Sequence, residues 1–273
     1  MIRSFIDIYN LASSKNRVNL AVINPKKDYL FETLSQAENL GWIHAIHVND
    51  TDDRKAAETA VSLVNEGKAD LLMKGDVSTH TVLTAVLNKD SGIRTGNRLS
   101  HTAVLESPGY NRLMLMTDGG VNPTLDDNVL SSIVLNAVEI AGKLQNEHPY
   151  IALLSLIEDV NPAVPETLVM ARMSEKYKDA PGFTVEGPIS IDVAVSLASA
   201  EAKQIKSRIS GETDIFIGPN ITTINFMVKS LLGMGGAKGG GLITGAKVPI
   251  VLLSRSDNSE TKLNSIALGI TSL

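Results

Sequence analysis

Three side chains of complementary chemistry follow the apolar run 248–253. Ser254 offers a hydroxyl that can donate to a developing oxyanion, Arg255 a guanidinium that can hold a phosphate, and Asp257 a carboxylate that can accept a proton. Because ligands bind outside the carboxyl ends of parallel strands, this is the best catalytic position in the chain. An equally weighted alternative makes Asp257, with Glu260 three residues later, a helix cap resembling a capping box.

A second candidate site follows the apolar run 69–73. The turn from this strand into a helix exposes backbone N–H groups that favour anions, so Lys74, Ser78 and Thr79 could contact a phosphate. The local sequence alone favours a plainer interpretation, in which Gly75 makes a tight turn and Ser78 or Thr79 is an ordinary N-cap.

The segment 94–101 collects guanidinium, hydroxyl and imidazole groups, which suit a phosphate or acyl-phosphate dianion. Its candidate contacts are Arg94, Arg98, Ser100 and His101. An equally weighted alternative leaves the arginines as solvated loop charges and the histidine as a hydrogen-bonded strand residue.

Two glycine-containing segments are also candidates. Asp118 and Asn122 flank a short glycine turn, where Asp118 could orient a cationic partner or bond its own backbone. The six glycines within 233–241 match neither the dinucleotide nor the nucleoside-triphosphate spacing. We therefore predict that a helix ends there and that a mobile connector follows. A weaker hypothesis is that this connector admits a long ligand such as a pantetheine arm.

The elements that position these residues alternate between short β-rich runs and helical periodicity, which predicts an α/β fold with mostly parallel sheets and helices on both faces. Strands are predicted at 18–23, 43–48, 69–73, 99–105, 112–116, 150–156, 214–217, 241–244 and 248–253. Helices are predicted at 27–40, 52–66, 130–144, from Pro165, at 191–208 with a break inside this range, and at 222–232 and 259–268. The runs 99–105 and 112–116 are too close for an intervening helix and predict an antiparallel pair.

Composition narrows the function classes. The 273 residues are 43% hydrophobic and 20% charged, which is typical of a chain that buries a core. The absence of cysteine excludes disulfides, thiolate nucleophiles and cysteine-based metal sites. A net charge of −5 gives no reason to expect nucleic acid or an anionic membrane as a partner. Residues 1–11 lack the apolar core of a secretory signal, so a cytoplasmic location is expected.

Six segments, in order, resemble the phosphate acetyltransferase and butyryltransferase family, and the butyryl branch more than the acetyl branch. They are LLMKGDVST, GIRTGNRLSHTAVLE, LMLMTDGGVNPT, EGPISIDVAVS, DIFIGPN and GLITGAKVPIVLLSRSD. The resemblance implies a two-lobed fold, like that of isocitrate and isopropylmalate dehydrogenases, with the active site in the interdomain cleft. The expected lobes are 1–118 with 245–273, and 119–244. A homodimer is also implied.

The resemblance further implies exchange of an acyl group between CoA and inorganic phosphate, with no permanently bound cofactor and no metal. Asp257 would accept the thiol proton, Ser254 would stabilise the tetrahedral oxyanion, and Arg255 would hold the leaving phosphate. The stretch from Arg98 to His101 would line the phosphate side. Asn220 and Lys229 complete the residues expected to contact substrate.

Two departures from the family pattern keep alternatives open. Ile224 stands where the family usually has a glycine, and the segment TDGGVNPT around Asp118 matches the usual family sequence less closely. The alternatives are a phosphate acetyltransferase, an inactive homologue that binds CoA or phosphate, and a decarboxylating dehydrogenase on a related fold. The last lacks support, because the chain has neither a compact acidic metal cluster nor a dinucleotide fingerprint.

Overall fold

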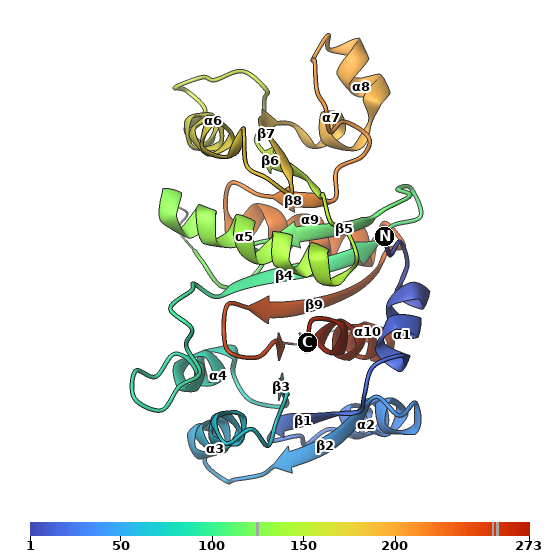
Figure 1. Cartoon of the computed structure of the whole chain (residues 1–273), viewed down its shortest axis with the longest axis vertical. Coiled ribbons are helices and arrows are strands. Elements are labelled where there is room, and N and C mark those ends of the chain that lie inside the picture. The colour runs from blue at the N-terminus through green and yellow to red at the C-terminus, as the bar shows by residue number, and fades with distance from the viewer. Residues whose placement is uncertain (124–125, 253, 255–256) are drawn as a thin grey trace. The chain divides into compact units, whose positions relative to one another are not determined.

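The structure is a computed structural model that describes residues 1–123, 126–252, 254 and 257–273. Strands and helices alternate along most of the chain, which confirms the predicted α/β class (Figure 1). The chain forms two compact units. Unit 1 comprises Met1–Ser4 and Ser100–Lys238, and unit 2 comprises Phe5–Leu99 and Gly239–Leu273.

These unit boundaries differ from the expected divisions at 118 and 245. The first change occurs after Leu99, because β4 (Ser100–Glu106) pairs antiparallel with β5 (Leu113–Thr117). In turn, β5 pairs in parallel with β8 (Ile215–Ile217), so backbone hydrogen bonds join both strands to unit 1. The antiparallel pair itself was predicted and is confirmed.

Unit 2 is built on a sheet with the strand order β2–β1–β3–β10–β9. Its strands are β1 (Val18–Ile23), β2 (Ile43–Val48), β3 (Leu71–Lys74), β9 (Lys238–Thr244) and β10 (Ile250–Val251). The first four strands in the sheet order pair in parallel, whereas β9 pairs antiparallel with β10. The parallel strands are largely apolar runs, as expected where helices cover both faces.

Helices cover both faces of the unit 2 sheet (Figure 1). They are α1 (Phe5–Ser13), α2 (Asp28–Asn39), α3 (Asp53–Asn65), α4 (Thr79–Val86) and α10 (Ser259–Thr271). In Figure 1, α3 and α4 lie on one face, and α1, α2 and α10 lie on the other. The sequence of α3 shows why it forms: Asp52 caps it by accepting from the Arg54 N–H, and a stripe including Ala56, Ala60 and Val64 is buried.

The carboxyl ends of β1, β3 and β10 meet at one edge of this sheet. Gly75 crosses the end of β1 so closely that an added Cβ would lie 2.3 Å from the Ile23 carbonyl oxygen, which only glycine permits. Lys74 and Ser254 follow neighbouring strands and therefore occupy the same edge.

The glycine-rich segment is not the mobile connector that the sequence predicts. Its second half forms β9, which begins at Lys238 rather than Gly241. An added Cβ on Gly240 would lie 2.8 Å from the Leu268 side chain, and Asn264 donates to the Gly239 carbonyl. Gly239 and Gly240 therefore let α10 pack closely on the strand, while admission of a long ligand by the segment stays a hypothesis.

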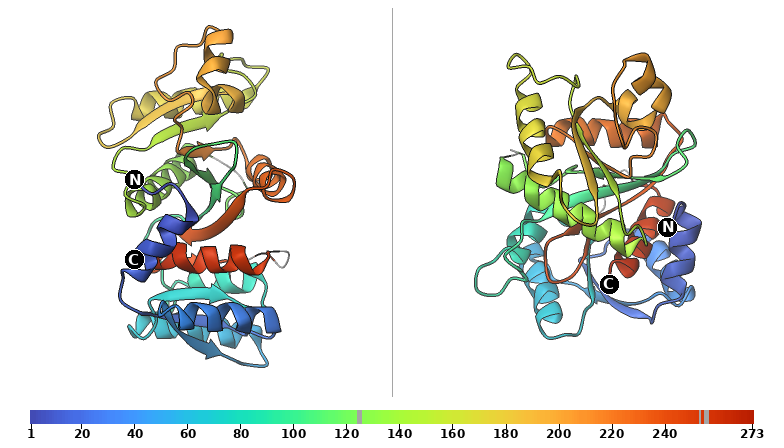
Figure 2. Two further views of the ribbon diagram at one scale, coloured as in Figure 1. Left: turned by 90° about the vertical axis from the view of Figure 1, so that its right-hand side faces the viewer. Right: turned by 45° about the horizontal axis from the view of Figure 1, so that its top comes forward.

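The strands of unit 1 have the order β4–β5–β8–β6–β7 and are parallel from β5 onward. Its remaining strands are β6 (Tyr150–Leu154) and β7 (Thr184–Ile189). Its helices are α5 (Asp127–Lys143), α6 (Pro165–Tyr177), α7 (Ile191–Val195), α8 (Leu197–Ala202) and α9 (Ile221–Gly233). Figure 2 shows α5 and α9 on opposite faces of the strands. Leu105, Met116 and Phe216 are fully buried in the core that α7, α8 and α9 cover.

The region 191–208, predicted as a helix with a break, contains two short helices. At Ser196 the backbone is extended, with φ −144° and ψ 117°, and the Ser196 hydroxyl accepts from the Ser199 N–H to begin α8. A serine that caps a new helix interrupts the old one, because its side chain competes for the backbone N–H.

Candidate functional site

The turn after β10 brings two of the three predicted catalytic residues together. Asp257 Oδ2 accepts a hydrogen bond from the Ser254 N–H at 2.7 Å, and the Asp257 N–H donates to the Ser254 carbonyl at 3.2 Å. Ser254 is exposed and Asp257 is partly buried. Arg255 lies outside the described residues, so its role stays a prediction. We call the hydrogen-bonded pair of Ser254 and Asp257 the reaction turn.

The helix after this turn is capped by Asn258, not by Asp257. Asn258 Oδ1 accepts from the Thr261 N–H at 2.8 Å, three residues on, as an N-cap does. The capping-box alternative for Asp257 is therefore wrong. The adjacent asparagine caps equally well, and Asp257 is left to bond within the reaction turn.

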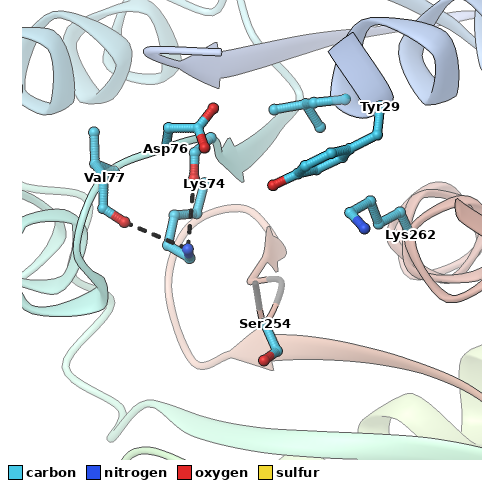
Figure 3. Close-up of a pocket in the computed structure, with 8 residues that line it drawn as sticks. Tyr29, Lys74, Asp76, Val77, Ser254 and Lys262 are labelled. Atoms are coloured by element: carbon cyan, nitrogen blue, oxygen red, sulfur yellow. Dashed lines mark hydrogen bonds between the residues drawn. The ribbon is translucent and has the colours of Figure 1, made fainter. Parts of the chain in front are cut away.

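A pocket lies at the edge shared by β3 and β10 (Figure 3). Its lining residues are Tyr29, Leu30, Lys74, Gly75, Asp76, Val77, Ser254 and Lys262. Lys74 is buried, and its Nζ lies 3.5 Å from the Gly75 carbonyl and 3.4 Å from the Val77 carbonyl. In Figure 3 the Ser254 hydroxyl points away from Lys74 and Lys262. The pocket thus joins one residue of the second predicted site to the reaction turn.

Lys262 and Tyr29 are residues of this pocket that the sequence analysis did not single out. Lys262 is 3% exposed, and its Nζ lies 4.4 Å from the centre of the Tyr29 ring. Burial lowers the pKa of Lys262, while the nearby charge of Asp257 opposes that shift. The sequence did contain one indication that Lys262 is buried. Lys262 shares a helix face with Ile266 and Gly269, at four- and seven-residue spacing, and an amphipathic helix buries that face.

The other unit 2 candidates are dispersed. Ser78 caps α4 by accepting from the Thr81 N–H at 3.0 Å, which is the plainer role. Thr79 is the first residue of that helix. Arg94 and Arg98 have exposed side chains on the segment between α4 and β4. Their assignment to phosphate stays a prediction.

In unit 1, Asp118 organises the turn that follows β5. Its carboxylate is 1% exposed and accepts hydrogen bonds from five N–H groups. The donors are the backbone N–H groups of His101, Gly120, Val121 and Asn122 and the side-chain amide of Asn122. Asp118 therefore has the turn-forming role, and its contact with substrate stays a prediction.

Asp118→Asn is expected to lower the free energy of unfolding by about 1–3 kcal/mol, because the new amide group would face donors that need an acceptor. Urea unfolding measures this. Asp126→Asn is the matched control, because exposed Asp126 caps α5 and asparagine caps as well as aspartate. An equal decrease in the free energy of unfolding in the two variants would contradict the turn-forming role of Asp118.

Three further predicted residues lie near that turn. Ser100 is fully buried, and its hydroxyl accepts from the Asn136 amide at 2.8 Å. The His101 ring lies against Gly119, where an added Cβ would be 3.1 Å from Nδ1. Asn122 is buried beside Asp118. The cluster is a close-packed polar corner at the end of β5.

The start of α9 is a further part of this corner. Asn220 caps α9 by accepting from the Thr223 N–H, and Asn225 donates to the Gly119 carbonyl at 3.1 Å. Ile224 is fully buried, and its side chain fills the space beside Gly218, where an added Cβ would lie 2.4 Å from Ile224 Cγ1. Exposed Lys229 lies more than two turns along α9 from Asn220 and is not brought to this corner.

Two observations limit the kinds of site in the described part of the chain. No three histidine, cysteine, aspartate or glutamate side chains there gather in a way that could hold a metal ion. Within the same ranges, none of the helices has both the length and the apolar character that a membrane crossing requires.

The α/β fold and the similarity to known proteins place this chain among the phosphate acyltransferases. Residues 10–270 match the model of the phosphate acetyl/butaryl transferase family, and the chain belongs to that family. It is 37% identical to the phosphate butyryltransferase of Clostridium acetobutylicum over 98% of this chain and 97% of that protein.

Solved structures agree with this assignment. A branched-chain phosphotransacylase from Enterococcus faecalis V583 is similar, with a TM-score of 0.85 and 32% identity over 93% of this chain and 98% of that one. The fold alone is shared with a 4-hydroxythreonine-4-phosphate dehydrogenase from Burkholderia phymatum, with a TM-score of 0.52 and 12% identity over 98% and 93%. The dehydrogenase-like architecture is confirmed, and the family assignment removes the dehydrogenase activity as an alternative.

Proposed function

We propose that this acyltransferase moves a butyryl or branched short-chain acyl group between CoA and inorganic phosphate, as acyl-CoA + phosphate ⇌ acyl phosphate + CoA. The family assignment supports the reaction class, and the names of the relatives support this acyl range. The observation that carries the proposal is the reaction turn, in which Ser254 and Asp257 are held together after β10. A homodimer, as the family resemblance implies, is part of the proposal.

The proposed step is direct attack in a ternary complex. The CoA sulfur attacks the acyl-phosphate carbonyl carbon while Asp257 accepts the thiol proton, and a C–S bond forms. Ser254 donates to the oxyanion of the tetrahedral intermediate. The C–O bond to phosphate then breaks, and Arg255 holds the departing phosphate. The reverse direction uses the same groups, and no acyl-enzyme is needed because the external thiol is the nucleophile.

The test is release of free CoA from butyryl-, isobutyryl- and acetyl-CoA, each with and without phosphate. We expect phosphate-dependent release that is fastest with butyryl- or isobutyryl-CoA. Release fastest with acetyl-CoA would replace the proposed acyl range by the acetyltransferase alternative. The absence of phosphate-dependent release from all three would contradict the proposed activity.

A specific observation keeps a non-catalytic binding role as the second candidate. Ile224 packs against Gly218 and near Gly119, so it occupies space that a glycine at this position would leave open. If the protein only binds ligand, calorimetry will detect butyryl-CoA binding while the release assay stays at background. Restored turnover in Ile224→Gly would then identify the side chain that blocks the reaction.

Arg255→Lys is expected to raise the KM for phosphate about tenfold and to change the KM for butyryl-CoA by less than about twofold. Lysine keeps the charge but loses the planar fork that binds two oxygens of a phosphate. Steady-state kinetics with each substrate varied separate the two constants. Arg54→Lys, an exposed substitution in α3, is the control. An unchanged phosphate KM would contradict the assignment.

A further inference from the structure

The pocket of Figure 3 contains a buried lysine with an unusual set of neighbours. Lys262 Nζ donates to the main-chain carbonyl of Asp257 and lies over the Tyr29 ring. The side chain comes from α10, the carbonyl from the reaction turn, and the ring from the first turn of α2. Lys262 therefore links three segments of unit 2 at the place where the proposed catalytic carboxylate lies.

A contribution to folding stability does not explain a lysine at position 262. In the described ranges, no carboxylate lies within ion-pair distance of Lys262, so the ammonium is buried against a carbonyl and an aromatic face. Taking a charge out of water carries a large desolvation cost, and a cation–π contact offsets only part of that cost. An apolar side chain of similar length would fill the same space without the desolvation cost.

The contacts of Lys262 show what the ammonium does. By holding the Asp257 carbonyl, it fixes the peptide unit that follows the Asp257 side chain. The carboxylate on the other side of the same residue accepts from the Ser254 N–H. Asp257 is therefore held at its main chain by Lys262 and at its side chain by Ser254.

We infer that Lys262, covered by the Tyr29 ring, is a positioning residue for acyl transfer, which sets the orientation of the reaction turn and hence of the Asp257 carboxylate. The inference rests on the proposed function. Lys262 acts through Asp257 and does not itself bind a substrate. The Tyr29 ring keeps the ammonium at the carbonyl by shielding one side of it from water.

The kinetic test is Lys262→Met, which keeps the length of the side chain and removes the charge and the donor. We expect kcat to fall by about 10- to 100-fold, because a small misplacement of a reacting group costs that much. The KM values for phosphate and butyryl-CoA should change by less than about twofold. The midpoint of thermal unfolding should stay equal or rise. Lys68→Met, at an exposed lysine of the same unit, is the control.

Two outcomes of the kinetic test overturn the inference. An unchanged kcat would show that the link to Asp257 does not matter for turnover. A rise in the phosphate KM with kcat preserved would show that Lys262 binds substrate directly.

If Lys262→Met does not fold, the variants Tyr29→Phe and Tyr29→Leu test the inference in its place. Phenylalanine keeps the ring and should keep kcat within about twofold, whereas leucine should lower kcat several-fold. Equal kcat values in these two variants would overturn the inference.

A second measurement does not depend on activity. The Ser254 N–H is bonded to Asp257 within the reaction turn, so its hydrogen exchange reports how firmly the turn is held. Exchange should be about tenfold faster in Lys262→Met than in the wild type and unchanged in Lys68→Met. Equal exchange rates would refute positioning of the turn. A wild type without phosphate-dependent CoA release would instead refute the proposed function, so the two failures are distinguishable.

Discussion

Asp257→Asn is expected to lower kcat for phosphate-dependent CoA release by about 10²- to 10⁴-fold, the usual contribution of a general acid–base group. The amide cannot accept the thiol proton in one direction or return it in the other. Its oxygen can still accept from the Ser254 N–H, which the carboxylate does at 2.7 Å, so the reaction turn should keep its shape.

The position of the helix cap makes this variant informative. Asn258, not Asp257, caps α10, so the substitution leaves the cap intact and the thermal midpoint should change by no more than a few degrees. Glu260→Gln, which removes a carboxylate from the first turn of α10, is the matched control and should keep kcat. If Asp257→Asn retains wild-type turnover while folded, Asp257 is not the base.

The elements with clear periodicity were predictable from the sequence. The ranges predicted for β1 and β2 match the structure, and α10 begins at the predicted Ser259. These segments have one dominant signal each, an apolar run or a helical stripe bounded by polar residues. Lys74 and Ser254 each follow a predicted strand, but only the parallel pairing of β3 with β10 in the folded protein brings these strand ends to one edge.

Other features depend on contacts that a local pattern does not contain. The sequence 238–241 is poor in side chains that favour strands, and it becomes β9 because Leu268 and Asn264 of α10 press against its glycines. Asp257 and Asn258 are both good caps, and only the backbone of the folded turn selects the second. The contacts of Lys262 could not be predicted from local sequence because its partners, Tyr29 and the Asp257 carbonyl, come from other segments.

The candidate site shows the same division. The residue types after a buried strand pointed to Ser254 and Asp257, and the structure shows a hydrogen bond between these two residues, while their catalytic roles stay predictions. Asp118 was ambiguous, and its turn-forming role became evident only from the five N–H groups that it accepts. Lys229 lies more than two turns along α9 from Asn220, and its contact with substrate stays a prediction.

Ser254→Ala is expected to lower kcat by about 10²- to 10³-fold, the cost of removing one oxyanion donor. The side chain is exposed at the end of β10, and in Figure 3 its hydroxyl points away from the buried lysines of the pocket. The Asp257 carboxylate bonds to the Ser254 backbone N–H, which alanine keeps. The variant therefore removes the hydroxyl while leaving the bond that shapes the reaction turn.

The defect should lie in kcat with the KM for butyryl-CoA nearly unchanged, because the oxyanion exists only on the way through the tetrahedral intermediate. Ser254→Thr retains a hydroxyl and should recover part of the rate, and Ser259→Ala, at the exposed first residue of α10, should have no effect. Equal activities of the alanine and threonine variants would mean that no donation from this hydroxyl stabilises the transition state. If Ser254→Ala lowers kcat strongly while Asp257→Asn keeps the wild-type kcat, then this turn contributes to catalysis through charge stabilisation and not through proton transfer.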